Sequence, residues 1–170
     1  MNQLPMHNAL KPLGWLEGIW RTENVGLGKF PTINPFKYYE EITFTSIGQP
    51  MLNYAAQSWH PEKKAPMHRE VGFLKIIPNT NTVSFFIAHN FGLTTIEEGE
   101  INDYVVNLLS TSISRKAEGS KPPAVLQLKR EFKLVDDLLY QTVYMATETT
   151  PELTEHLKVV YKKQQESLCK

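Results

Sequence analysis

The sequence has little cysteine, no surplus of charge and no long apolar run, and each absence narrows the class of protein. Cys169 is the only cysteine, so a disulfide framework, a cysteine-ligated zinc site and an iron–sulfur cluster are excluded. Lys plus Arg and Asp plus Glu both number 18, a balance that disfavours nucleic acid and anionic membranes as partners. No apolar run approaches the roughly 18 residues of a membrane span, and the first residues lack a signal-peptide pattern. We therefore expect a cytoplasmic protein.

The common catalytic motifs are also missing. The sequence holds neither the Gly-x-Ser-x-Gly elbow of hydrolases nor a Gly-x-x-x-x-Gly-Lys-Ser/Thr phosphate loop, which disfavours covalent catalysis and nucleotide binding. Glu97, Glu98 and Glu100 lie on one predicted strand. Because adjacent residues of a strand face opposite sides, we expect these carboxylates to form a solvated face rather than a catalytic acid/base pair. His68 and Glu70 offer two metal donors without a third, so we expect at most a weak zinc site there.

What the sequence does contain is a succession of short β-branched and aromatic runs broken by Gly, Pro, Asn and Asp. Its 170 residues suit one domain, 1–170, with a single core. Leu10, Leu13 and Leu16 recur at helical spacing before the first run, and Pro12 keeps the predicted helix short. Ten strands are then predicted, at 18–25, 38–46, 51–60, 67–76, 82–88, 93–101, 104–112, 126–134, 138–147 and 156–163.

Most of the predicted strands are joined by tight turns, such as Asp136-Asp137, and turns of this length predict antiparallel neighbours. Two connections, 26–37 and 116–123, are long, and loops of that length tend to be functional or mobile. A meander of ten short strands avoids exposed edges by closing on itself. The sequence therefore predicts an all-β fold, a ten-stranded antiparallel up-and-down β-barrel with a short N-terminal helix.

Three polar side chains are predicted to point into this barrel. Arg130, Glu40 and His89 each share a strand face with apolar residues, because alternate residues of a strand face the same side. Polar groups among apolar neighbours suggest a cavity rather than a solid core, since an unpaired buried charge is too costly to keep. The alternative is an Arg130–Glu40 ion pair beside a hydrogen-bonded histidine, and the pattern leaves both open.

The last predicted strand carries a histidine at the mouth of the barrel. Leu157 and Val159 fall on its apolar face, and His156 begins it. A neutral imidazole fixed by rigid backbone beside an apolar cavity suits an axial haem ligand, although the spacing alone favours a surface histidine. Strict alternation turns His156 away from the apolar face, so for this histidine to bind haem either a bulge or a turn intervenes at 155–156 or the haem sits outside the regular strand geometry. We expect the turn, because Pro151 precedes it.

Seven short motifs stand in a fixed order along the chain. They are Gly18-Ile19-Trp20, Phe30-Pro31-Thr32, Gly48-Gln49-Pro50-Met51-Leu52, Pro66-Met67-His68-Arg69-Glu70, Gly72-Phe73-Leu74, Glu97-Glu98-Gly99-Glu100 and Thr154-Glu155-His156-Leu157. In order and spacing they resemble the nitrobindin family in its animal form, over about residues 13–163. That form is similar to the C-terminal domain of a THAP-type zinc-finger protein.

The resemblance implies a barrel of the fatty-acid-binding-protein and lipocalin kind that carries one haem b per chain. The family's axial iron ligand carries over to His156, and a second haem contact carries over to Thr32. The family's tyrosine before the proline is Phe30 here. Its glycine-rich Gly-x-Trp-x-Gly-x-Gly motif becomes Gly18-Ile19-Trp20-Arg21-Thr22-Glu23-Asn24, which has lost the last two glycines. His68 and His89 are the candidates for polar groups on the open side of the haem.

From the resemblance we expect a ferric haem protein that binds nitrogen oxides, including nitric oxide, and isomerises peroxynitrite to nitrate. The resemblance leaves open a homodimer and a nuclear location. Two other functions also stay open. One is a non-catalytic intracellular carrier, whose fatty acid or other apolar ligand would place its carboxylate on Arg130. The other is a regulatory domain that senses haem or nitric oxide. The residues alone show only a compatible histidine.

Overall fold

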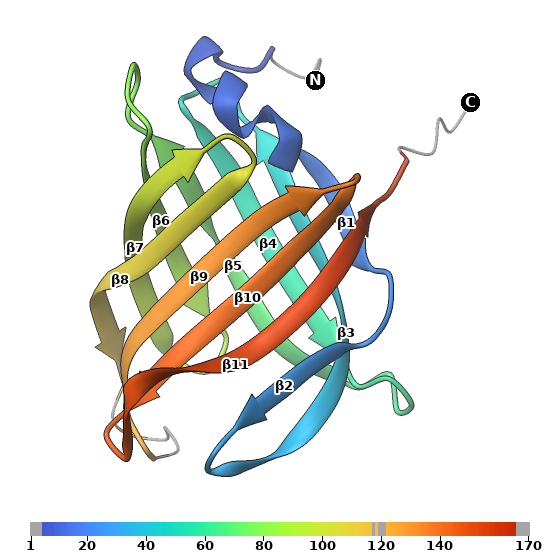
Figure 1. Cartoon of the computed structure of the whole chain (residues 1–170), viewed down its shortest axis with the longest axis vertical. Helices are drawn as coiled ribbons and strands as arrows, with labels where there is room; N and C mark the ends of the chain where they lie inside the picture. Colours follow the sequence, from blue (N-terminus) through green and yellow to red (C-terminus); the bar gives the residue numbers. More distant parts are fainter. Residues whose placement is uncertain (1–4, 117, 119–121, 166–170) are drawn as a thin grey trace.

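The computed structural model describes residues 5–116, 118 and 122–165, most of which lie in strands that wind around a barrel (Figure 1). A 3-10 helix, η1 (Asn8–Leu16), precedes the strands. The strands are β1 (Gly18–Thr22), β2 (Gly26–Phe30), β3 (Ile33–Ser46), β4 (Met51–Trp59), β5 (Pro66–Ile76), β6 (Thr82–His89), β7 (Leu93–Asn102), β8 (Val105–Arg115), β9 (Val125–Val135), β10 (Leu138–Thr147) and β11 (Thr150–Lys163).

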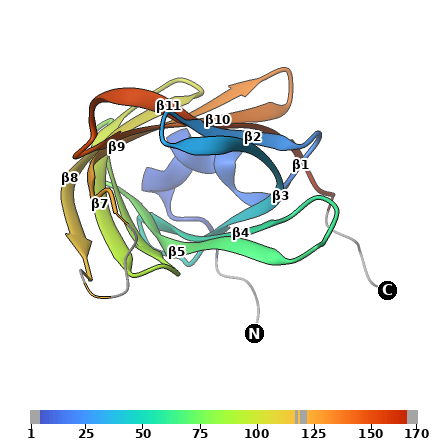
Figure 2. The ribbon, with the colours of Figure 1, turned by 90° about the horizontal axis from the view of Figure 1, so that it is seen from below.

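Strands β1 and β2 together fill one place in the barrel wall. Each of them pairs antiparallel with β3 on one side and with β11 on the other. The eleven strands therefore occupy ten places around a closed barrel, which Figure 2 shows from below. From β3 to β11, each strand pairs antiparallel with the next one along the chain. The predicted ten-stranded antiparallel barrel is confirmed.

The long connection predicted at 26–37 was wrong, because most of it forms the hairpin of β2 and β3. Aromatic rings on β3 lie close against the backbone of β2. A Cβ atom on Gly28 would lie 2.2 Å from the ring of Phe36, and one on Gly26 would lie 2.6 Å from the ring of Tyr38. Glycine is needed here for close approach within a strand and not for a loop.

Two features of the sequence fall outside the described residues. Cys169 is one, and the middle of the predicted connection 116–123, between β8 and β9, is the other. Within the described ranges, no helical segment has the length and apolar character needed to cross a membrane.

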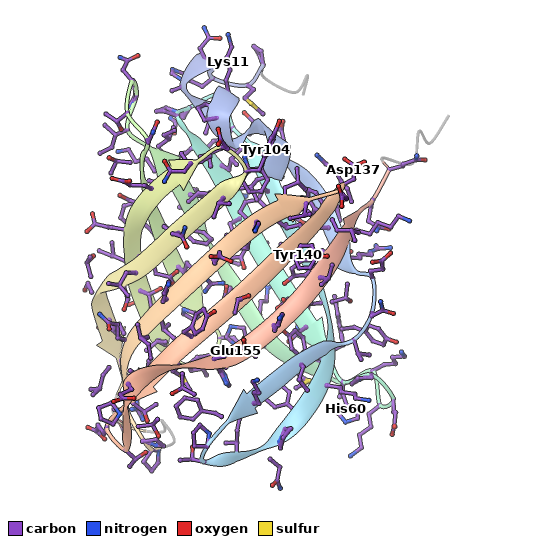
Figure 3. All side chains as sticks on the ribbon, in the orientation of Figure 1. Lys11, His60, Tyr104, Asp137, Tyr140 and Glu155 are labelled. Carbon is purple, nitrogen blue, oxygen red and sulfur yellow. The ribbon has the colours of Figure 1, made fainter. Side chains whose placement is uncertain are left out.

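The helix η1 closes one end of the barrel, at the top of Figure 1. Its Leu10, Leu13 and Leu16 are fully buried and join the main apolar core, which confirms the predicted short helix. Tyr104, at the turn between β7 and β8, packs edge-on against Trp15 with the ring centroids 6.2 Å apart (Figure 3). Because apolar side chains fill this end, the space for a ligand lies at the other.

Candidate functional site

A cavity of about 390 Å³ lies within one end of the barrel. This is the end where β10 turns into β11 and β2 turns into β3, at the bottom of Figure 1. This volume is within the usual range of small-molecule sites, roughly 300–1,000 Å³. Its lining combines apolar and titratable side chains: Phe36, Tyr38, Glu40, Ser58, Met67, His68, Glu70, His89, Asn90, Phe91, Leu93, Val125, Leu128, Arg130, Val143, Met145, His156 and Leu157.

His156 stands in a β-bulge of β11, so the turn expected before it was wrong. Val143 of β10 pairs with Leu157, and Tyr144 pairs with Glu155, which leaves His156 as the extra residue between two pairs. A bulge shifts the alternation of side chains by one residue. His156 can therefore line the cavity together with Leu157, although strict alternation would place the two on opposite faces.

Strand β11 also begins earlier than predicted, at Thr150 rather than at 156. Pro151 lacks a backbone N–H, and a proline inside a strand is tolerated where one side has no partner. On the side of β11 that faces away from β10, strand β2 pairs with it only at Leu157 and Lys158. The proline therefore lies at an open edge and does not interrupt a ladder.

One hydrogen bond orients the imidazole of His156. Its Nδ1 lies 3.0 Å from the carbonyl oxygen of Lys29. Because a carbonyl only accepts, Nδ1 carries the proton and Nε2 keeps its lone pair. Burial lowers the pKa of His156, although the Lys29 carbonyl acts in the opposite direction. The rings of Phe30 and Phe36 stand edge-on, with centroids 5.7 and 6.3 Å from that of the imidazole. A neutral imidazole with a fixed tautomer fits axial ligation of haem iron.

Arg130 points into the interior as predicted, but the ion pair with Glu40, one of the two alternatives that the sequence left open, was wrong. The Arg130 Nη1 and Nη2 atoms donate to Glu70, each at 3.1 Å, and Nε donates to Glu97 at 3.1 Å. Burial opposes the charge of Glu70, but the guanidinium together with the contacts from His68 and His89 outweighs burial and holds the pKa of Glu70 well below its usual range. Burial likewise opposes the charge of Arg130, whose pKa the two carboxylates raise. All three guanidinium nitrogens are engaged.

Two of the three glutamates on β7 form the solvated face expected for them, since Glu98 and Glu100 are exposed. For Glu97 the expectation was wrong. Its side chain is fully buried and accepts a hydrogen bond from Thr95 at 3.1 Å, in addition to those from the arginine. The signal was present in the sequence, because Glu97 alternates with Thr95 and Ile101, which are also buried.

Glu40 has a different partner, the hydroxyl of Tyr161, which donates a hydrogen bond to its carboxyl group. Burial raises the pKa of Glu40 to about 7, although the hydrogen bond from Tyr161 favours the charged form. A carboxyl group of this kind keeps its proton in the folded protein at pH values where the unfolded chain has lost it. The protonation state of the cavity wall therefore changes near neutral pH.

We expect Glu40→Gln to remove a pH dependence of the free energy of unfolding. Folding raises the pKa of Glu40 from 4.5 to about 7, so the folded state binds more protons in that interval and the wild type loses stability as pH rises through it. The loss is at most about 3 kcal/mol. Urea unfolding at about pH 5 and about pH 8 measures this effect. The free energy of unfolding of Glu40→Gln, relative to that of the wild type, should be higher at about pH 8 than at about pH 5. The exposed change Glu98→Gln should show no gain, and an equally flat Glu40→Gln would contradict the prediction.

The two histidines expected on the open side line the cavity together, His68 from β5 and His89 from β6. The His68 Nε2 atom lies 3.1 Å from Glu70 Oε1, and the His89 Nδ1 atom lies 3.2 Å from the same oxygen. The two nitrogens are 3.3 Å apart. His68 and Glu70 thus have a third donor beside them, which the sequence reasoning missed because His89 lies on the neighbouring strand.

Thr32, the second predicted haem contact, lies away from the cavity wall. It is exposed in the turn between β2 and β3 and is not among the described residues that line the cavity. Phe30, just before the turn, contacts His156 instead. A haem contact through Thr32 stays a prediction.

Comparisons with known proteins agree with the barrel fold described above. Residues 9–163 match the family described as "THAP4-like, heme-binding beta-barrel domain". The chain is 46% identical over 159 residues to the peroxynitrite isomerase THAP4 of Rattus norvegicus, a match that covers 93% of this chain and 28% of the rat protein. It is 35% identical over 161 residues to the peroxynitrite isomerase Rv2717c of Arabidopsis thaliana, covering 94% of this chain and 91% of that protein.

A solved structure supports the same family. The crystal structure of Rv2717c from M. tuberculosis matches with a TM-score of 0.83 and 31% sequence identity, covering 95% of this chain and 100% of that one. The chain therefore spans little more than a quarter of the rat relative, at 28%, but nearly all of the plant and mycobacterial ones. From the match over residues 9–163 and from these relatives, this chain belongs to the family of THAP4-like haem-binding β-barrel domains, the nitrobindin family.

Proposed function

We propose that this chain holds one haem b through His156 and isomerises peroxynitrite to nitrate. The observation that carries the proposal is the imidazole of His156, whose Nδ1 is tied to the Lys29 carbonyl so that Nε2 is left to bond a metal. The related proteins from rat and from Arabidopsis thaliana are named peroxynitrite isomerases, which supports the same reaction for this chain.

The walls of the cavity have separate tasks in this proposal. Leu93, Leu128 and Val143 form a small apolar cluster of buried side chains, which excludes water from one side of the cavity. When bound, the haem supplies an iron whose open position can accept an anionic substrate. Strand β5, which lies across the barrel from β11 (Figure 2), carries His68, and its neighbour β6 carries His89. Their ring N–H groups are donors for an anion that enters between the two walls.

Nitric oxide binding, a cytoplasmic location and a homodimer are further parts of the proposal. They follow from the sequence and its family resemblance alone. Nitric oxide would occupy the same iron position as the substrate, so His156 would serve both ligands.

A fatty-acid carrier, the second candidate, has less support from the site. A carrier of this kind needs a cation that can receive the carboxylate of its ligand. Arg130 already donates through all three guanidinium nitrogens to Glu70 and Glu97. A fatty acid would have to displace a buried carboxylate from its partner, and leaving that charge unpaired is strongly unfavourable. The cavity therefore favours haem over an anchored fatty acid.

The proposal is tested by the decay of peroxynitrite with the haem-reconstituted full chain. We expect decay to accelerate in proportion to the haem-loaded protein, and the share of nitrate among the products to rise. The same chain without haem should behave like buffer. A chain that binds haem in a one-to-one complex but changes neither the rate nor the products would overturn the isomerase assignment, while haem binding would stand.

A further inference from the structure

Three side chains with metal-ligand chemistry meet on the cavity wall formed by β5 and β6. Their donor atoms are His68 Nε2, His89 Nδ1 and Glu70 Oε1, and they all lie within 4.8 Å of one another. The three separations are 3.1 Å from His68 to Glu70, 3.2 Å from His89 to Glu70 and 3.3 Å between the histidines. The donors therefore form a nearly equilateral triangle.

The size of this triangle matches one face of a metal coordination sphere. Zinc bonds of roughly 2.0–2.1 Å at tetrahedral angles separate neighbouring ligand atoms by roughly 3.3–3.4 Å. Two histidines and one carboxylate are also the ligand set of catalytic zinc sites and of mononuclear iron sites that keep positions open. The measured separations come within a few tenths of an ångström of this spacing.

Protons alone cannot satisfy all three contacts. If both neutral imidazoles turn an N–H toward Glu70, the contact between His68 and His89 has two donors and no acceptor. If His68 instead donates to the Nδ1 atom of His89, the lone pair of that atom is occupied and Nδ1 has no proton for Glu70. A cation at the centre of the triangle accepts electron pairs from all three atoms at once.

The charge around the cluster also favours a cation. Glu70 and Glu97 bring two negative charges against the single positive charge of Arg130. Both carboxylates are buried, so the surplus negative charge is poorly solvated. Arg130 also contacts the ligand oxygen, because its Nη2 atom donates to Glu70 Oε1 at 3.1 Å. A metal ion would share this oxygen with one hydrogen bond, since a carboxylate oxygen has two lone pairs.

A second layer of contacts holds the carboxylate donor in place. The hydroxyl of Tyr54 donates to Glu70 Oε2 at 2.8 Å, and Arg130 Nη1 donates to the same oxygen at 3.1 Å. Thr95 in turn donates to Glu97, which fixes the other side of the guanidinium. Supporting contacts of this kind orient metal ligands and raise metal affinity.

We propose that His68, Glu70 and His89 form a binding site for a divalent transition-metal ion of the zinc and iron(II) type. The site lies on the wall across the barrel from His156, and it uses none of the atoms assigned to the haem. It does not depend on haem binding, but it shares His68 and His89 with the proposed isomerase function, for which only their other ring nitrogens would remain. The ion would keep at least one coordination position open toward the cavity, where a small anion could bind it.

The test uses Zn²⁺ as the probe and the full chain freed of haem and metal. Titration against a chromophoric chelator should show one Zn²⁺ bound per chain, and Zn²⁺ should raise the melting temperature. X-ray absorption at the zinc edge should report nitrogen and oxygen neighbours without sulfur. Absence of saturable one-to-one binding by folded wild-type chain would overturn the proposal.

Histidine variants separate this site from the other histidines of the chain. His68→Ala and His89→Ala should each lower Zn²⁺ affinity by at least about tenfold. His68 is the primary variant because its side chain is 30% exposed, so its loss leaves the fold intact. His60→Ala, a change in the loop after β4 (Figure 3), should bind like the wild type. Equal loss of affinity in His60→Ala or in His156→Ala would place the ion elsewhere and overturn the assignment.

Discussion

Replacing His156 by alanine should leave the chain unable to hold haem in a stoichiometric complex while the barrel stays folded. The change removes the imidazole whose Nε2 is left to bond the iron. It should cost little stability, because the side chain is half-buried, sits in a bulge and makes one hydrogen bond to the Lys29 carbonyl. A hydrogen bond of this kind contributes on the order of 1 kcal/mol. Haem titration followed by the Soret band, beside a thermal melt of each protein, measures both effects.

The matched control is His60→Ala, which removes a histidine from an exposed loop and should titrate like the wild type (Figure 3). Added imidazole should partly restore the spectrum of His156→Ala, because a free ligand can occupy the vacated position. A His156→Ala protein with the wild-type Soret band and one haem per chain would sink the assignment of the axial ligand.

Alternation along single strands was enough to predict which side chains face inward. Arg130, Glu40 and His89 all line the cavity, because side-chain direction in a strand has a period of two residues. The same rule, applied to β7, would have placed Glu97 inside. For His156 alternation was not enough. Its role came from the family resemblance, and alternation placed it on the wrong face because a bulge shifts the side-chain direction at this position.

The partners of these side chains could not be predicted in the same way. Arg130 meets Glu70 across 60 positions of sequence and Glu97 across 33, and such pairings depend on the curvature and registry of the closed barrel. The registry of β2 and β3 also explains why residues 26–30 form a strand and not a loop. Gly26 and Gly28 lie on β2, where aromatic rings on β3 pack against their backbone. These contacts exist only after distant segments have met.

Replacing Arg130 by leucine should destabilise the folded barrel more than any other single change considered above. The substitution leaves Glu70 and Glu97 buried without their cationic partner, and removing one member of a buried ion pair costs about 3–5 kcal/mol. The predicted alternative, a pair with Glu40, would have assigned the cost to the wrong carboxylate. Urea unfolding should show the loss as a lower midpoint with an unchanged slope.

Second substitutions decide which carboxylate depends on Arg130. Adding Glu97→Gln to Arg130→Leu should recover a large part of the lost stability, because one unpaired charge is removed and the amide oxygen can still accept from Thr95. Adding Glu40→Gln at about pH 8 should give only the gain that it gives in the wild type, since Glu40 bonds to Tyr161 and not to the arginine. Recovery by Glu40→Gln in excess of that gain, with none from Glu97→Gln, would show that the interior charges are paired differently.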